Sequence, residues 1–251
     1  MAPLIVSREG AIAVLSLNRP EALNAFTPDM LKALIEALGE LERDESVGAV
    51  ILQGEGRAFS AGVDLKILQS TSPVAGRISS AFDDAAQAAA DVVRKSPLPV
   101  IAKVHGFCFT GALELALHCD FILTTVDTKF GDTHVKWGLR PTWGMSQNLA
   151  RAVGVRRARE LSFTARTFSG AEAAAWGLAN EAAADKASLD ALARMRAGEI
   201  ARASRGAVGA YKKLYRVHEE NRPLEDALAE EIRRDFPEIT DTAERLKGFG
   251  A

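Results

Sequence analysis

The sequence predicts an α/β fold with a helical C-terminal part. In the first half of the chain, short apolar segments rich in β-branched residues alternate with segments in which apolar residues recur at helical spacing. After Pro141 the pattern becomes mostly helical. Alternating strands and helices indicate a sheet covered by helices. The 251 residues are enough to bury a large core without disulfides or metal ions.

The expected elements follow in chain order. The first strand spans 12–17, and a helix begins at Pro28, where Thr27 supplies a capping hydroxyl and apolar residues then recur at helical spacing. A second buried strand covers 47–52, and an Ala-rich helix covers about 74–94. The remaining elements are strands at 99–104 and 121–125, and helices at 112–118, at 156–162, at 170–176 and in several segments from 189 onward.

The change from alternating elements to continuous helix divides the chain into two regions. We expect a core over 1–195 and a helical region over 196–251. No low-complexity linker lies between them in the sequence, so the two regions are expected to follow each other directly.

Composition and charge exclude several classes of protein. Hydrophobic residues make up 47% of the chain and charged residues 25%, which is the balance of an ordinary globular protein. A net charge of -2 with scattered basic residues provides no strong field towards nucleic acid or an anionic membrane. No stretch approaches the roughly 20 apolar residues that span a bilayer, and the first residues do not resemble a signal peptide. We expect a cytoplasmic protein that binds neither nucleic acid nor membrane.

Motifs for metals, redox cofactors and several hydrolases are missing from the sequence. The two cysteines, Cys108 and Cys119, stand outside any metal-ligand or C-x-x-C spacing and are expected to be reduced core thiols. No G-x-S-x-G, H-E-x-x-H or Walker sequence is present. The loop at 54–56 has two of the glycines of a dinucleotide motif, but Phe59 stands where the third belongs. We therefore expect neither a metal nor a separate cofactor.

Two segments of the chain repeat one pattern. Residues 50–65 and 100–115 each run from a buried strand through a loop of small residues to the start of a helix. Such a loop leaves backbone N–H groups free at the positive end of the helix, where they can hold an anion or a developing oxyanion. Two loops of this kind could converge on one oxygen. The alternative is that both are only tight connections between a strand and a helix.

A series of motifs extends over nearly the whole chain. In order and spacing they resemble the crotonase family of enoyl-CoA hydratases and isomerases; the matching segments are 18–25 (NRPEALNA), 59–66 (FSAGVDLK), 99–107 (PVIAKVHGF), 114–120 (ELALHCD), 129–131 (KFG), 138–141 (GLRP) and 171–178 (AEAAAWGL). The resemblance implies the crotonase-like (ClpP/crotonase) fold of repeated ββα units with a helical C-terminal subdomain. It also implies homotrimers, often paired into hexamers, with 196–251 as the trimerisation region.

The resemblance implies an acyl-CoA thioester as the substrate, so coenzyme A would be part of the substrate and not a cofactor. By position, the thioester oxygen is expected against the backbone amides of Val63 and Gly111. Two preorganised amides facing an enolate oxygen can contribute roughly 3–4 kcal/mol each to transition-state stabilisation. Contacts with CoA and the acyl chain are expected at Ala22, Ala61, Asp64, Leu65, Phe107, Leu139 and Pro141.

The expected catalytic residues are Glu114 and His134. Hydratases of this family use two glutamates to add water to a double bond; Glu114 matches the first, whereas His134 stands at the position of the second. Histidine titrates near neutral pH and can donate or accept a proton. Asp132 is an alternative acid, and His134 could instead be a hydrogen-bonded core residue. Bulky Trp143 and Met145 are expected to narrow or reshape the acyl pocket.

Hydration of a 2-enoyl-CoA is therefore the main hypothesis. Glu114 alone is also compatible with other reactions of the family, namely isomerisation, decarboxylation or cleavage of a C–C bond. A protein that binds acyl-CoA without turnover is the alternative from a different class.

Overall fold

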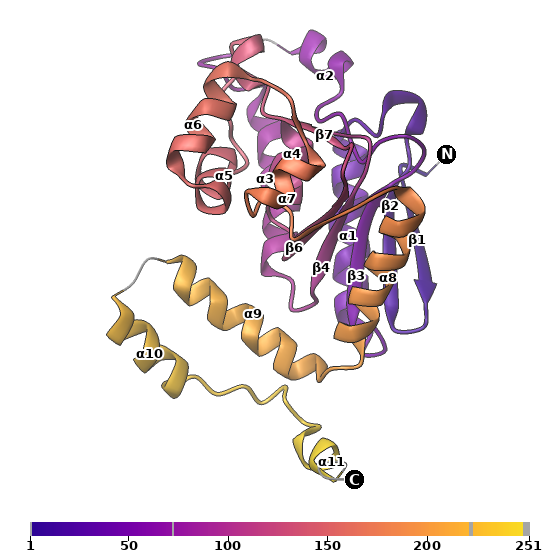
Figure 1. Ribbon diagram of the computed structural model, residues 1–251, viewed down its shortest axis with the longest axis vertical. Coiled ribbons are helices and arrows are strands. Elements are labelled where there is room, and N and C mark those ends of the chain that lie inside the picture. Colours follow the sequence, from indigo (N-terminus) through magenta and orange to yellow (C-terminus); the bar gives the residue numbers. More distant parts are fainter. Residues whose placement is uncertain (1, 72, 221–222, 248–251) are drawn as a thin grey trace.

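Two β-sheets organise the chain (Figure 1). The computed structural model describes residues 2–71, 73–220 and 223–247, and leaves the side chains of Leu65 and Ser80 undescribed. The larger sheet has the order β1-β2-β3-β4-β6-β9 and is parallel except for the β1–β2 hairpin. Its strands are β1 (Leu4–Glu9), β2 (Ile12–Leu17), β3 (Ala49–Gly54), β4 (Val100–Val104), β6 (Phe121–Thr125) and β9 (Glu181–Ala183).

The smaller sheet is built from short strands that follow those of the larger sheet. It has the order β5-β7-β8, and the strands are β5 (Phe107–Phe109), β7 (Lys129–Gly131) and β8 (Phe168–Ser169). An isolated parallel bridge between Ser60 and Cys108 adds a fourth extended segment, on the free side of β5.

The chain crosses from the larger to the smaller sheet three times in the same way. After β3 it passes Ser60 and enters α2 (Leu65–Ser70); after β4 it forms β5 and enters α4 (Gly111–Ala116); after β6 it forms β7 and enters the short helix η2 (His134–Trp137). These are the ββα repeats expected from the sequence. Because the small-sheet segments lie side by side, the turns that follow them meet at one edge.

The central strands of the larger sheet are covered on both faces. Alternate residues of a strand point to opposite faces, so Val50 and Leu52 of β3 join the core beneath α1 (Pro28–Arg43) and α3 (Ser80–Lys95), whereas Ile51 meets α8 (Lys186–Ala201). Figure 1 shows α1 and α8 on opposite sides of β3. Burial on both faces explains why the parallel strands read as continuous apolar runs.

Helix α1 begins at Pro28 as expected, and the Thr27 hydroxyl accepts a hydrogen bond from the amide of Met30. The helix expected from residue 74 begins only at Ser80, with the Ser79 side chain as its cap. Residues 74–77 instead form a turn in which Ala75 and Gly76 have positive φ values of 50° and 77°. The turn's Gly76 carbonyl accepts a hydrogen bond from the Arg140 amide, so a tertiary contact replaces the first helical turn.

The predicted division at residue 195 falls within α8. Both halves of this helix pack on the larger sheet, through Leu189 and Ala197 among others, because its apolar side chains fill the face opposite α1. The part of the chain that extends from the core therefore begins after α8, with α9 (Arg205–Glu219), α10 (Leu224–Arg233) and α11 (Thr242–Leu246) (Figure 1). Within the described ranges, no helix combines the length and apolar character needed to cross a membrane.

Three further helices complete the fold: α5 (Met145–Val153), α6 (Val155–Thr164) and α7 (Gly170–Ala175). A turn of 3₁₀-helix, η1 (Pro20–Ala22), follows β2. Cys108 and Cys119 are buried free thiols, as expected from the sequence.

Gly106 sits at the crossing between β4 and β5, and its replacement tests how tightly the two sheets are joined. Its φ is +66°, and a Cβ there would collide with the carbonyl oxygen of Arg57. We expect Gly106→Ala to lower the free energy of unfolding by about 3 kcal/mol, from strain at positive φ plus overpacking.

Gly10 provides the matched control for Gly106, because its φ is +62° and nothing lies within 4 Å of a Cβ built on it. Gly10→Ala should lower the free energy of unfolding by only about 1–2 kcal/mol, the cost of a positive φ for a residue with a Cβ. Urea unfolding of both variants measures the difference; equal losses would contradict a close contact at Gly106.

Candidate active site

A cavity of about 900 Å³ opens where the turns after the small-sheet segments meet. Polar groups gather on one wall, where Glu114 and His134 face the cavity together with Thr110 and Thr133. The remaining lining combines apolar side chains, among them Leu68, Ile78, Leu139 and Trp143, with basic ones such as Arg57 and Arg140. A concave, largely apolar site with a few convergent polar groups is the usual form of a small-molecule site.

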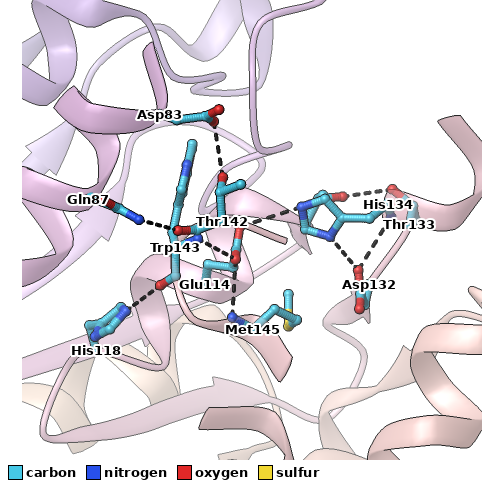
Figure 2. Close-up of polar contacts among 11 residues, drawn as sticks. Asp83, Gln87, Glu114, His118, Asp132, Thr133, His134, Thr142, Trp143 and Met145 are labelled. Carbon is cyan, nitrogen blue, oxygen red and sulfur yellow. Dashed lines mark hydrogen bonds and ion pairs between the residues drawn. The ribbon is translucent and has the colours of Figure 1, made fainter. Parts of the chain in front are cut away.

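Glu114 lies on α4 and is almost fully buried, with 1% of its surface exposed. One carboxylate oxygen, Oε1, accepts hydrogen bonds from the backbone amides of Trp143 (3.0 Å) and Met145 (3.1 Å). The other, Oε2, lies 3.5 Å from Nε2 of His134 (Figure 2). The carboxylate is thus fixed by one oxygen and presents the other to the imidazole.

His134 begins η2, three residues after the end of the small-sheet strand β7. Its Nδ1 lies 2.7 Å from Oδ1 of Asp132, on the side away from Glu114 (Figure 2). The backbone amide of His134 donates to the same oxygen at 3.3 Å. Asp132 is itself buried and does not line the cavity. Of the two groups considered from the sequence, His134 is the one that faces the cavity.

The surroundings of the His134 imidazole favour its charged form. Burial disfavours the imidazolium, but hydrogen bonds to Asp132 and Glu114 and the charges of both carboxylates outweigh this effect and raise the pKa of His134 to about 9. Burial also opposes ionisation of Asp132, yet its hydrogen bonds to His134 and Ser162 hold the pKa of that carboxyl below its usual range. A protonated imidazole between two acids is therefore the expected state at neutral pH.

Two backbone amides beside the cavity make no hydrogen bond within the described residues. Val63 and Gly111 both line the cavity, and neither amide donates a hydrogen bond to any group in the described residues. Their loops touch, because a Cβ on Gly62 would lie 2.7 Å from the carbonyl oxygen of Phe109 and 3.5 Å from the Gly111 nitrogen. The two loops predicted from the repeated pattern are thus adjacent in space.

Thr110, which precedes Gly111, has a strained backbone. Its φ is 52° and its ψ is -113°, a combination that β-branched residues rarely adopt. The Thr110 amide donates to the carbonyl of Gly131 at 2.9 Å, and its hydroxyl is 2.7 Å from that of Thr133. These bonds tie the turn at Gly111 to the turn that carries His134. Strain of this kind is typical of functional sites.

Asp64 lines the cavity, as expected, but both of its carboxylate oxygens accept hydrogen bonds from protein groups. One of its oxygens accepts a hydrogen bond from Arg19 at 2.8 Å, and the other caps α2 through the amide of Lys66 at 2.9 Å. Arg19 also donates to the carbonyl of Ala25. The pair therefore fixes the loop beside Val63, a role that the sequence did not predict.

The other residues expected to contact CoA or the acyl chain fall into two groups. Ala22, Ala61 and Leu139 line the cavity. Phe107 and Pro141 do not; the Phe107 ring instead packs against Phe109, with ring centroids 5.9 Å apart. The side chain of Leu65 lies outside the described part of the structure.

The segment 142–145 contributes Thr142 and Trp143 to the cavity wall and is anchored on two sides. The Thr142 hydroxyl donates to Asp83 on α3 at 3.0 Å, and Gln87 on α3 donates to the Thr142 carbonyl at 2.7 Å. On the other side, His118 lies 2.6 Å from the Trp143 carbonyl (Figure 2). These partners are more than 24 residues from the wall in sequence, and no local pattern indicated them.

Comparison with known proteins identifies the family. The family model for enoyl-CoA hydratase/isomerase matches residues 7–251. The chain belongs to the enoyl-CoA hydratase/isomerase family. It is 35% identical over 252 residues to a probable enoyl-CoA hydratase from Rhizobium meliloti, an alignment that covers 99% of this chain and 93% of that one.

Solved structures of enoyl-CoA hydratase/isomerase family members confirm the crotonase-like fold expected from the sequence. An enoyl-CoA hydratase/carnithine racemase from Magnetospirillum magneticum superposes with a TM-score of 0.89 at 34% identity, over 99% of this chain and 92% of that one. A putative enoyl-CoA hydratase from Thermobifida fusca, solved in complex with CoA, gives a TM-score of 0.80 at 30% identity, over 91% of this chain and 89% of that one.

The charge state of His134 can be measured by NMR titration of the imidazole groups. We expect His134 to keep its proton up to about pH 9, because the carboxylates on either side stabilise it. His105 is an internal reference, since burial lowers its pKa below the ordinary 6.5.

Asp132→Asn removes one of these charges and should lower the pKa of His134 without moving that of His105. A His134 pKa at or below 6.5 in the unaltered protein would contradict the charged pair.

Proposed function

We propose that the protein adds water to a 2-enoyl-CoA thioester, with Glu114 as general base and His134 as general acid. The observation that carries the proposal is the approach of the two groups in the cavity wall, 3.5 Å apart, beside two backbone amides that have no hydrogen-bond partner among the described residues. Family membership supports an acyl-CoA substrate, and one structural relative was solved with CoA bound.

The proposed binding mode places CoA at the basic side of the cavity. Arg57, Lys66, Lys136 and Arg140 all contribute to the lining and can attract the phosphates of the nucleotide. Ala22 and Ala61, which are small, leave room for the backbone of the loop to approach the ligand. The acyl chain would then extend along Leu68, Ile78 and Leu139.

The proposed oxyanion site consists of the amides of Val63 and Gly111. In the reaction, electrons shift from the double bond to the thioester oxygen and form an enolate. Donors that already face that oxygen stabilise the charge without reorganisation, at roughly 3–4 kcal/mol for each amide. The site can accept the bulky side chain of Val63, because only the backbone N–H of this residue would bind the thioester oxygen.

The proton transfers require one base and one acid. The carboxylate of Glu114 accepts a proton from water while the water oxygen attacks the β carbon, and the imidazolium of His134 then donates a proton to the α carbon of the enolate. A water oxygen placed about 3 Å from both Oε2 of Glu114 and Nε2 of His134 can form a hydrogen bond with each. A second glutamate is not needed, since the raised pKa of His134 keeps it protonated at neutral pH.

We also propose that the protein assembles into trimers or pairs of trimers, as the resemblance implies. Helix α10 carries Leu224, Leu228 and Ile232 at intervals of four residues, and 70%, 45% and 87% of their surfaces are exposed. A helix with an uncovered apolar stripe usually meets another surface. Sedimentation velocity measures the assembly directly, and a monomer at micromolar concentration would contradict it.

Hydration of crotonyl-CoA, followed by the loss of the absorbance of the conjugated thioester, tests the proposed reaction. We expect turnover in the unaltered protein and a loss of about 10²–10⁴-fold in kcat for Glu114→Gln and for His134→Ala, the usual contribution of a general base or acid. Glu114→Gln keeps an oxygen that can accept the two amide hydrogen bonds, so its effect reports on proton transfer.

Glu36→Gln is the matched control, because Glu36 is an exposed glutamate on α1. It should leave the hydration rate unchanged. Binding of a CoA thioester without any hydration, or a rate that Glu114→Gln leaves intact, would contradict the proposal.

A further inference from the structure

A second cavity, of about 970 Å³, lies on the other side of the 142–145 wall. It lies beside α9, and its lining includes Ala90, Leu117, Ile200, Val208 and Tyr211. The two cavities share Thr142 and Trp143 as lining residues. The space beyond the active-site cavity is therefore large enough for an extended chain, and Thr142 and Trp143 lie at the boundary between the two cavities.

Trp143 is wedged at this boundary, with 4% of its surface exposed. Its six-membered ring lies on Gly111, where a Cβ would come within 2.8 Å of Cη2. The rings of Phe26 and Phe82 flank it, with centroids 6.1 and 5.8 Å away. The indole thus fills the space next to the amide that would hold the thioester oxygen.

Hydrogen bonds also fix the backbone of Trp143. Its amide donates to Glu114 at 3.0 Å, and its carbonyl is 2.6 Å from Nε2 of His118 (Figure 2). Thr142 is held by Asp83 and Gln87 on the opposite side. A movement that opened the wall would break contacts with both α3 and α4, including one to the proposed catalytic base.

We propose that Trp143 closes the acyl end of the active-site cavity and restricts the enzyme to thioesters of short acyl chains. This inference rests on the proposed function for the position of the thioester. Each methylene that a protein buries strengthens binding by roughly fourfold. A chain longer than the closed cavity must bend or leave its end in water, so its extra methylenes weaken binding. Removal of the indole opens a path from the active-site cavity towards Leu117 and Ile200 of the second cavity.

Binding of saturated acyl-CoA thioesters tests the inference without any need for turnover. Isothermal titration of butyryl-, octanoyl- and palmitoyl-CoA, below their micelle concentrations, should give affinity for the unaltered protein that falls by about tenfold or more from the shortest chain to the longest. In Trp143→Ala the order should reverse, so that palmitoyl-CoA binds at least about tenfold more tightly than butyryl-CoA. Trp143→Leu should give an intermediate preference.

Trp176→Ala is the matched control. Trp176 packs against Phe168, with ring centroids 5.5 Å apart, and lines neither cavity. The same loss of an indole there should leave the chain-length preference unchanged. If the unaltered protein binds palmitoyl-CoA as tightly as butyryl-CoA, or if folded Trp143→Leu and Trp143→Ala keep the original preference, the inference is overturned. The affinities of the unaltered protein for the three thioesters test the inference even where a variant does not fold.

Hydration rates separate this inference from the proposed function. kcat/KM for crotonyl-CoA and for trans-hexadecenoyl-CoA should shift in Trp143→Leu as the affinities do. If the protein shows the expected series of affinities but hydrates neither substrate, the proposed reaction is overturned and the role of Trp143 is supported. Hydration with no effect of residue 143 on chain preference would support the reaction and overturn the role.

Discussion

The rest of the site depends on the hydrogen bonds that hold the buried carboxylate of Glu114. An ionised carboxylate out of contact with water is costly unless hydrogen bonds or an opposite charge compensate it. Here one oxygen accepts two backbone amides from the 142–145 segment, and the other faces the imidazole of His134. The same group therefore helps to hold the 142–145 segment with its indole, and it acts together with Asp132 to raise the pKa of His134.

The fold brings these parts together by repetition. Three times, a buried strand of the larger sheet leads to a short extended segment and then to a turn. Because the extended segments are neighbours, the turns at Val63, Gly111 and His134 meet even though about 70 residues separate the first from the last. Contacts between the turns, such as that of Thr110 with Thr133, keep the amides and the imidazole at fixed separations.

The parts of the fold that could be predicted are those with a strong local pattern. The strands β2 and β6 and helix α1 were predicted closely, because continuous burial or a capped amphipathic repeat is visible in a short window. Strand β1 was missed because five of its six residues are exposed and it lies at a sheet edge. The strands of the smaller sheet have two or three residues each, too few to show any period.

The residues of the candidate site also divide into those that the sequence could predict and those that it could not. Glu114, His134 and the two amides were predicted because they lie within motifs that match a known family in order and spacing. The partners that position them were not. Arg19 and Asp64 are 45 residues apart, and Thr142 and Asp83 are 59 apart, so nothing local in the sequence links them. The choice between Asp132 and His134 also required the structure, because only side-chain direction distinguishes a group that faces the cavity from one that lies behind it.

The central claim is that Glu114 and His134 act as one unit in proton transfer. The most direct measurement is a double-mutant cycle on kcat for crotonyl-CoA hydration with Glu114→Gln, His134→Gln and the double variant. Residues that work as a unit are strongly non-additive, so we expect the double variant to be little slower than either single variant. Effects that multiply independently, or a His134→Gln variant that retains the full rate, would contradict the account.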